Sequence, residues 1–335
     1  MGGKMRNFDY KKLAEKNWDN EILLLCSKIH EYKGRQELFI RQKPAQLGRL
    51  IEIARIQSTE ASNRIEGIVT TSTRIKQLVA EKTAPKNRDE KEILGYRDVL
   101  NTIHESHEYI DITPNNILQL HRDLLKHAGF SYGGSFKNVQ NYIKETRPDG
   151  TEIVRFMPLA PYETPGAVEA ICRSFVETAA LEIVDPLILI PAFICDFLCI
   201  HPFNDGNGRM SRLLTLLLLY KCGYEVGKYI SIEKQIEKTK DVYYDVLQKI
   251  DYGWHEEEND VTPFIKYNLK MILASYIEFD NKLGKFTSAD VLANCPTVGR
   301  TSVFNALKKL TEEGYIQKHG ERRHTFYVKT SKSPW

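Results

Sequence analysis

The sequence predicts a mainly α-helical protein: a helical bundle with one inserted β-hairpin, followed by a winged helix-turn-helix domain at the C-terminal end. Three observations lead to this prediction. Apolar residues recur at helical spacing along most of the 335 residues. Two short β-rich runs flank the turn sequence Arg-Pro-Asp-Gly at 147–150, and the pattern of elements changes again near Lys282.

The composition is typical of a globular protein from a reducing compartment. The hydrophobic fraction is 42% and the charged fraction 27%, which argues against extensive disorder. The six cysteines are scattered, mostly within apolar runs, and no signal peptide is recognisable. We therefore expect a cytoplasmic location with reduced thiols. The apolar segment 187–200 is shorter than the roughly 20 residues of a spanning helix, so we expect no membrane association.

The first long helix with a clear pattern is expected to end near Glu66, with Gly67 as its stop signal. Its apolar face is formed by Leu47, Leu50, Ile51, Ala54 and Ile56. A second helix has Thr113 as N-cap and Pro114 at its first position, and closes at Gly129. Two more are expected at about 166–181 and 186–200. Together these segments predict a helical bundle.

The hairpin is expected at about 138–157, inserted among the helices. The C-terminal segment 281–335 is expected to form a helix, a turn, a longer helix and a β-ribbon around Gly320, which is the order of a winged helix-turn-helix. It holds ten Lys and Arg against four Asp and Glu, whereas the whole chain carries only +3. Such a basic end suits DNA, with these candidate contact residues: Arg300, Lys308, Lys309, Arg322, Arg323 and His324. Dimerisation or target binding is the equal alternative.

The segment HPFNDGNGRMSR, residues 201–212, interrupts two very apolar helices and predicts an anion-binding site. Pro202 biases His201 away from helical geometry, so the preceding helix should end near Ile200. The two glycines allow a tight loop with exposed backbone N–H groups. Arg209 and Arg212, three residues apart, share one side of the next helix. Loop amides, a helix N-terminus and two arginines together make a polyphosphate cradle.

Two further residues of this segment suggest chemistry. Asp205 is a hard oxygen ligand that could hold Mg²⁺ against phosphate oxygens. His201 is the nearby group whose ordinary pKa suits proton removal from an attacking hydroxyl. The phosphate-loop pattern GxxxxGK[ST] is absent from the sequence, which disfavours a P-loop nucleotidase.

The segment resembles the Fic-family signature HxFx(D/E)GNGRxxR at every defined position. The resemblance implies a protein adenylyltransferase, which moves AMP from ATP onto a Ser, Thr or Tyr hydroxyl of a target protein. It assigns His201 as the base, Asp205 as the Mg²⁺ ligand and Phe203 as an apolar anchor. It assigns the anion hole to Gly206, Asn207 and Gly208, and phosphate binding to Arg209 and Arg212.

The same resemblance extends to three neighbouring features. Gly208 argues for AMP transfer, because the related death-on-curing kinases usually carry Lys there. The hairpin 138–157 is similar to the family's flap, along which a target segment pairs as an added strand. Tyr243 and Tyr244, in the segment that follows the core, are candidates to lie near the adenine.

A second motif, SNRIEG at residues 62–67, resembles the family's inhibitory pattern [S/T]xxxE[G/N]. It assigns Ser62, Glu66 and Gly67 to a built-in brake. A Glu66 carboxylate paired with Arg212 would take the donor that otherwise holds the ATP γ-phosphate, leaving ATP in a pose unsuited to attack.

We therefore expect an autoinhibited Fic adenylyltransferase that uses ATP and Mg²⁺, acts on a target protein and forms a homodimer. The expected divisions are an N-terminal helical segment with the brake (1–90), the Fic core (91–235), connecting helices (236–280) and the winged helix (281–335). Two alternatives stay open: a DNA-binding regulator whose core senses nucleotide, and a Fic enzyme that removes AMP or transfers phosphocholine or phosphate.

Overall fold

The computed structural model describes residues 6–42, 44–146, 150–321 and 325–330. At its centre lies α7 (Pro186–Ile200), which is apolar on all sides except at Asp196 and is buried from Leu187 to Ile200. A helix of this kind must be surrounded by others. α8 (Asn207–Lys221) packs against it, joined by the loop 201–206. The predicted helix 186–200 is confirmed, and the position of the 201–212 segment is the junction of the two most buried helices.

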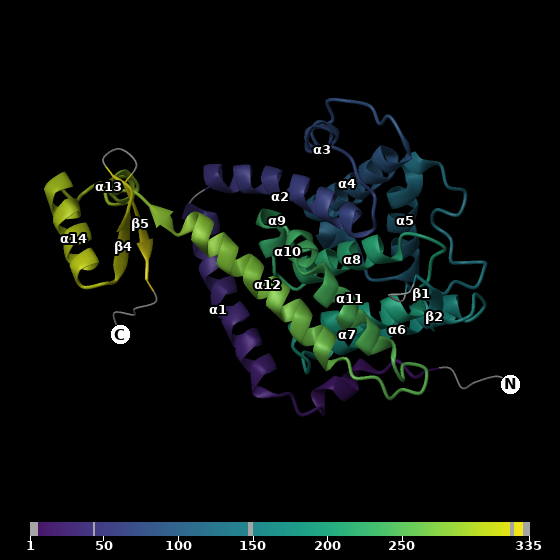
Figure 1. The fold of residues 1–335 in the computed structure, drawn as a ribbon. Helices are drawn as coiled ribbons and strands as arrows, with labels where there is room; N and C mark the ends of the chain where they lie inside the picture. Colours follow the sequence, from purple (N-terminus) through teal and green to yellow (C-terminus); the bar gives the residue numbers. More distant parts are fainter. Residues whose placement is uncertain (1–5, 43, 147–149, 322–324, 331–335) are drawn as a thin grey trace.

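Further helices surround this pair (Figure 1). The predicted helix after Thr113 is present, with the Thr113 side chain accepting from Asn116 N, and the helix expected at 166–181 begins two residues earlier. The surrounding helices are α4 (Arg88–Ser106), α5 (Pro114–Leu125), α6 (Thr164–Leu181), α9 (Val226–Tyr229), α10 (Ile232–Lys238) and α11 (Lys240–Asp251), with 3-10 turns at Tyr10–Ala14, His107–Tyr109 and Lys126–Ala128.

Two long helices, α1 (Asn20–Gln42) and α12 (Thr262–Leu283), lie side by side along one flank of the bundle (Figure 1). The short α3 (Ser72–Val79) packs on α4 at another edge. Among the described residues, no helix has the length and apolarity needed to span a membrane.

α2 (Pro44–Ile65) carries the SNRI part of the second motif and packs on α10, α4 and α9. Its end is set by backbone geometry. Gly67 has φ 79°, Gly67 N donates to Arg64 O at 3.0 Å and Ile68 N donates to Asn63 O at 3.0 Å. These two bonds form a Schellman motif, in which a glycine takes the left-handed position after the last turn. The helix end expected near Glu66 is confirmed.

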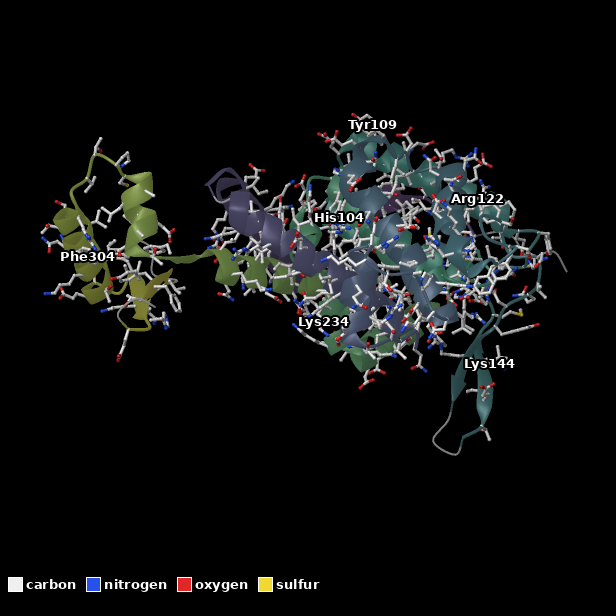
Figure 2. All side chains as sticks on the ribbon, turned by 90° about the horizontal axis from the view of Figure 1, so that it is seen from above. His104, Tyr109, Arg122, Lys144, Lys234 and Phe304 are labelled. Carbon is white, nitrogen blue, oxygen red and sulfur yellow. The ribbon has the colours of Figure 1, made fainter. Side chains whose placement is uncertain are left out.

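The predicted hairpin is formed by β1 (Ile143–Thr146) and β2 (Glu152–Phe156), paired antiparallel with Lys144 opposite Val154. Seen from above, it projects away from the helices and carries Lys144 on its first strand (Figure 2). Arg147, Pro148 and Asp149 of the predicted turn lie outside the described residues.

The C-terminal elements follow the predicted order. They are β3 (Lys285–Phe286), α13 (Ser288–Asn294), α14 (Arg300–Glu312), β4 (Ile316–His319) and β5 (Phe326–Lys329), with strand order β3-β5-β4. Val303, Leu307, Ile316 and Tyr327 form a small core of their own, and the group stands beyond the end of α12 (Figure 1). The candidate residues Arg322, Arg323 and His324 lie outside the described part of the chain.

Candidate active site

His201 caps the C-terminal end of α7. Its backbone is left-handed, with φ 51°, and its N–H donates to Phe197 O at 3.0 Å. The following Pro202 disfavours the right-handed region, so the helix stops at Ile200 as predicted. A left-handed conformation costs a non-glycine residue roughly 1–2 kcal/mol, and surrounding contacts must hold it.

The imidazole of His201 is held as a neutral base. Its Nδ1 lies 3.2 Å from the Leu198 carbonyl oxygen; since a carbonyl only accepts, Nδ1 carries the hydrogen and Nε2 keeps the free lone pair. Burial lowers the pKa of His201 to about 4, with a further lowering by Lys137 and an opposing effect of the Leu198 hydrogen bond. The ring is thus unprotonated at neutral pH and able to accept a proton at once.

Phe203 anchors the loop in the core. It is fully buried, and its ring stacks on the His121 imidazole with 3.7 Å between centroids. His121 in turn accepts from Gly134 N at 3.1 Å through Nδ1 and donates to Asp205 O at 3.0 Å through Nε2. The sequence motif contains Phe203 but not its partner His121, which comes from α5.

Asn207 closes the loop on itself. Its amide accepts from Phe203 N at 2.9 Å and donates to Phe203 O at 2.7 Å. The side chain is therefore occupied within the loop, and only the backbone of Asn207 can serve an anion hole. Gly206, at φ 85°, is the N-cap of α8 and offers no side chain to cap it. The first-turn N–H groups of α8 thus remain for a ligand at the helix N-terminus.

Asp205 and Arg209 lie together at this N-terminus. Asp205 Oδ1 accepts from Gly206 N at 2.6 Å, and its side chain is 41% exposed. Arg209 is buried, pairs with Glu92 Oε2 on α4 at 2.8 Å and lies 3.7 Å from Asp205. Arg209 Nε has no hydrogen-bond partner among the described residues. A buried guanidinium with an unused donor is suited to an incoming anion.

Arg212 is engaged by α2. Its Nε donates to Ser62 Oγ at 2.8 Å, and its Nη2 donates to Ser62 O at 2.9 Å and to Glu66 Oε1 at 2.7 Å. Burial alone would raise the pKa of Glu66, but Arg212 outweighs it and the pKa lies below its usual value. The pKa of Arg212 is raised because Glu66 outweighs the lowering by burial. The predicted contact between the two motifs is present as a charged, hydrogen-bonded pair.

Two glycines permit this pair. Gly67 ends α2 so that Glu66 stands at the helix terminus. Gly208 lies under the carboxylate: a Cβ at this position would overlap Glu66 Oε1 and come within 3.0 Å of Glu66 Cδ. A side chain at position 208 is therefore incompatible with the observed placement of Glu66.

An open cavity of about 270 Å³ joins these parts. Its lining includes Glu66 and these residues of the first motif: His201, Asn204, Asp205, Gly206, Asn207, Gly208, Arg209 and Arg212. Tyr243 and Tyr244, the candidates for the adenine side, also line it, and the Tyr244 hydroxyl donates to Ile65 O at 3.3 Å. The hairpin adds Ile143, Lys144 and Arg155 to the wall.

Several of these residues were not anticipated from sequence. Glu92, His121 and Arg155 come from separate segments. Glu92 pairs with Arg209, and His121 contacts Phe203 and Asp205. Arg155 lines the cavity itself and pairs with Asp251 at 2.7 Å. Their only sequence signal was polarity within segments that read as ordinary amphipathic helix or hairpin.

Fold and site together define a helical protein with an uncharged histidine at the end of one helix, an uncapped N-terminus with two arginines at the start of the next, and a carboxylate paired with one of these arginines. Residues 111–219 match the model of the Fic/DOC family, so the chain contains a domain of that family.

Curated relatives carry Fic names as well. The protein adenylyltransferase Fic of Drosophila melanogaster is 30% identical over 270 residues, covering 78% of this chain and 47% of that protein. The protein adenylyltransferase Fic of Nematostella vectensis is 26% identical over 258 residues, covering 75% and 54%. The chain thus spans about half the length of the curated relatives it matches.

Solved structures share the fold. A Fic family protein from Desulfovibrio desulfuricans superposes with a TM-score of 0.67 at 20% identity, covering 95% of this chain and 98% of that chain. A Fic domain protein from Bacteroides thetaiotaomicron gives a TM-score of 0.64 at 22% identity, covering 79% and 97%. The expected mainly helical Fic fold is confirmed.

Proposed function

We propose that this chain is a protein adenylyltransferase, moving AMP from ATP to a hydroxyl of a target protein, and that Glu66 restrains it. The relatives named above support the reaction. The single observation that supports it within this chain is the placement of the neutral His201 imidazole and the α8 N-terminus on one cavity.

Each part of the cavity has a role in this reaction. The α8 amides and Arg209 bind the phosphates and stabilise charge that develops during transfer. Tyr243 and Tyr244 line the cavity together with Leu247 and offer aromatic surface to the adenine. Nε2 of His201 takes the proton of the target hydroxyl as its oxygen attacks the α-phosphorus, and pyrophosphate leaves.

The donor set around Asp205 fits Mg²⁺. The described residues hold no cluster of three His, Cys, Asp or Glu side chains that could bind a metal ion by themselves. Asp205 is a half-exposed carboxylate on the phosphate-binding loop, which is how proteins usually hold this ion: by one or two carboxylates, with water and phosphate oxygens completing its shell. When bound there, Mg²⁺ would neutralise phosphate charge.

Glu66 acts as a brake by occupying Arg212. Three of the donor contacts of Arg212 go to Ser62 and Glu66, and charge-assisted bonds of this kind contribute about 1.5–3 kcal/mol each. With Arg212 unavailable, the γ-phosphate of ATP loses its cation and the α-phosphorus is misplaced for attack. Ser62 and Gly67 serve the brake by holding the guanidinium and by ending α2.

The hairpin is proposed to bind the target as an added strand. Val154 and Met157 on and after β2, and Val139 and Tyr142 before β1, are exposed apolar side chains, and the hairpin projects from the body (Figure 2). Strand addition needs only backbone groups and a few such side chains. A bound segment would lie beside the cavity wall formed by Ile143 and Lys144.

Labelled ATP tests the proposal. The Glu66→Gly protein is incubated with α-³²P-ATP and Mg²⁺, alone and with lysate, and labelled bands are identified by mass spectrometry. An added mass of AMP on a protein hydroxyl supports adenylyl transfer. Phosphocholine or phosphate adducts, or release of AMP from a premodified protein as the main activity, would replace it with the corresponding alternative.

DNA binding by the C-terminal elements is a second candidate, favoured by the charge of α14. Along this helix Arg300, Lys308 and Lys309 are exposed, and the acidic residues Glu312 and Glu313 come only at its end. Gel shift with genomic fragments over a salt series tests it, because neutralised phosphates give a linear fall of log K with log salt. Retarded bands that vanish in the double variant Arg300→Ala/Lys308→Ala support DNA binding. If the native chain gives no retarded band, dimerisation or target binding becomes the role proposed for these elements. Size-exclusion chromatography tests the proposed homodimer.

A further inference from the structure

The short segment before the hairpin, residues 137–141, runs beside the catalytic loop and is bonded to it residue by residue. Lys137 N donates to Pro202 O at 2.8 Å, and Asn204 Nδ2 donates to Asn138 Oδ1 at 3.1 Å. The two segments are more than sixty positions apart in sequence. These polar contacts hold the two segments in register.

Lys137 is a buried cation with unusual partners. Lys137 is only 3% exposed. Its ammonium group donates to Ile200 O at 2.9 Å and to Asn141 Oδ1 at 3.0 Å. Burial lowers the pKa of Lys137 to about 8, so the charged form with three donors prevails at neutral pH. Ile200 O is the last carbonyl of α7, where a helix leaves its acceptors unpaired and favours a cation.

Asn141 also contacts the backbone of the catalytic loop. Its Nδ2 donates to Phe203 O at 3.0 Å and lies 3.4 Å from His201 O. With Lys137 it therefore serves four consecutive carbonyls, those of residues 200–203. These four residues contain the left-handed His201, whose conformation needs external support.

We propose that Lys137 and Asn141 are positioning residues for His201. They fix the backbone that carries the imidazole, and because they lie directly before β1, they join the base to the hairpin on which a target would bind. Neither residue lines the cavity, so they act through His201 rather than on the nucleotide. The inference rests on the proposed transfer reaction and names two residues for which the sequence motif has no place.

The test uses the full chain carrying Glu66→Gly, with Lys137→Met, Lys137→Arg and Asn141→Ala added singly. Lys221→Met is the matched control, because Lys221 also donates to backbone carbonyls, His107 O and Glu108 O, but at an exposed position on the far end of α8. Self-adenylylation gives kcat and the KM for ATP, and calorimetric titration with a non-hydrolysable ATP analogue gives Kd.

We expect Lys137→Met and Asn141→Ala to lower kcat roughly 10- to 100-fold, the penalty of a base displaced by about an ångström. The Kd of the analogue should change less than twofold, Lys137→Arg should recover most of the rate, and Lys221→Met should match its parent. A kcat within twofold of the parent value overturns the inference, and so does a loss of activity that is explained by weaker binding of the analogue. If Lys137→Met fails to fold, Asn141→Ala decides alone.

A second measurement separates this inference from the proposed function. In ¹⁵N-histidine NMR spectra, the His201 ring is identified by its absence in His201→Ala, and its nitrogen shifts report the tautomer. The native chain should show hydrogen on Nδ1, and Lys137→Met should show mixed tautomers. If the Glu66→Gly parent transfers no AMP, the proposed function is wrong, but the tautomer of His201 still tests whether Lys137 positions the ring. The same tautomer in Lys137→Met and in the native chain would then contradict the positioning role.

Discussion

Arg212 Nη2 donates to Glu66 Oε1 at 2.7 Å, joining residues 146 positions apart in the chain. The same guanidinium is held by Ser62 through two further bonds. A cation at the phosphate end of the cavity is therefore already paired before any nucleotide arrives. Under the proposed function, the strength of this pairing sets how readily ATP takes a productive pose.

The first prediction concerns removal of the carboxylate. Glu66→Gly should raise self-adenylylation about 10- to 150-fold, the equivalent of the 1.5–3 kcal/mol of one charge-assisted hydrogen bond. Labelled-ATP gels measure it. Glu81→Gly is the matched control, since Glu81 also follows a helix end, with φ 57°, and is exposed just beyond α3, outside the cavity lining. Equal rates in the two variants would exclude a brake at Glu66.

The second prediction concerns the base. His201→Ala in the Glu66→Gly background should lower the transfer rate by about 10²- to 10⁴-fold, the usual contribution of a general base. His107→Ala is the control, because His107 Nδ1 makes a comparable contact with Ile103 O at 3.3 Å outside the cavity. Persistence of transfer in His201→Ala would mean that another group accepts the proton.

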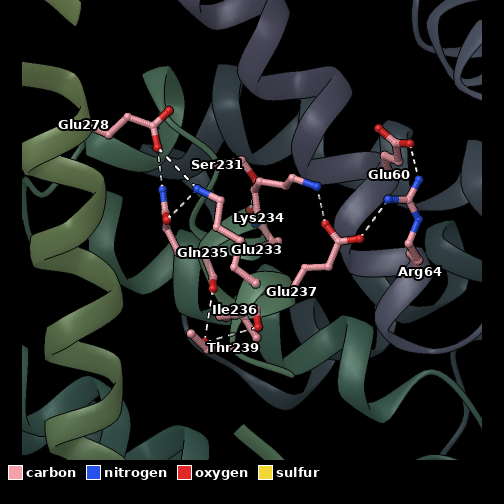
Figure 3. A network of polar contacts seen from close by, with 11 residues as sticks. Glu60, Arg64, Ser231, Glu233, Lys234, Gln235, Ile236, Glu237, Thr239 and Glu278 are labelled. Atoms are coloured by element: carbon pink, nitrogen blue, oxygen red, sulfur yellow. Dashed lines mark hydrogen bonds and ion pairs between the residues drawn. The ribbon is translucent and has the colours of Figure 1, made fainter. Parts of the chain in front are cut away.

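The third prediction concerns the attachment of α2 to α10. Arg64, two residues before Glu66, pairs with Glu60 on its own helix and with Glu237 Oε1 at 2.9 Å (Figure 3). Because such partly exposed pairs contribute 0.2–1 kcal/mol, Glu237→Gln should raise basal self-adenylylation no more than about fivefold, well below Glu66→Gly.

Glu278→Gln is the control for that experiment. Glu278 belongs to the same polar network but accepts from Gln235 at 2.7 Å, on the side of α12 (Figure 3). If both variants leave the basal rate unchanged, the Arg64–Glu237 pair plays no part in holding the brake.

The fourth prediction concerns acid stability. Burial lowers the pKa of His104 to about 3 and those of His121 and His201 to about 4, below the ordinary value near 6.5. Between these values the unfolded chain binds more protons than the folded one, so stability is full above about pH 6.5 and falls as pH drops through 4. Thermal unfolding at pH 7 and 4.5 measures the loss in Tm.

Substitution of one of these histidines tests the cause. His104→Phe removes a titrating group whose Nδ1 has no hydrogen-bond partner among the described residues, and should make the Tm less dependent on pH. The same dependence in native chain and variant would assign the acid loss to other groups, such as the paired carboxylates.

Much of the fold followed from local pattern. The ends of α2 and α7 and the start of α5 were predicted because Gly67, His201 with Pro202, and Thr113 with Pro114 act within one turn of the chain. The end of α5, expected at Gly129, lies at Leu125, and a 3-10 turn continues to Ala128. The hairpin was predicted because its turn residues are contiguous. The divisions at 90, 235 and 280 stay predictions: helices on both sides of 90 and 235 pack into one continuous core, whereas the elements after Leu283 have a separate one.

The sequence by itself predicted an anion site at 201–212, because those residues lie close in the chain and carry their own backbone requirements, and it predicted the contact with 62–67 from the resemblance of both segments to family motifs. Only the tertiary structure decided that Glu92 pairs with Arg209, that His121 stacks on Phe203, and that Lys137 and Asn141 support His201. Such contacts join side chains from separate helices and loops. Their partners are chosen by how the helices pack around α7, and local periodicity carries no information on that choice.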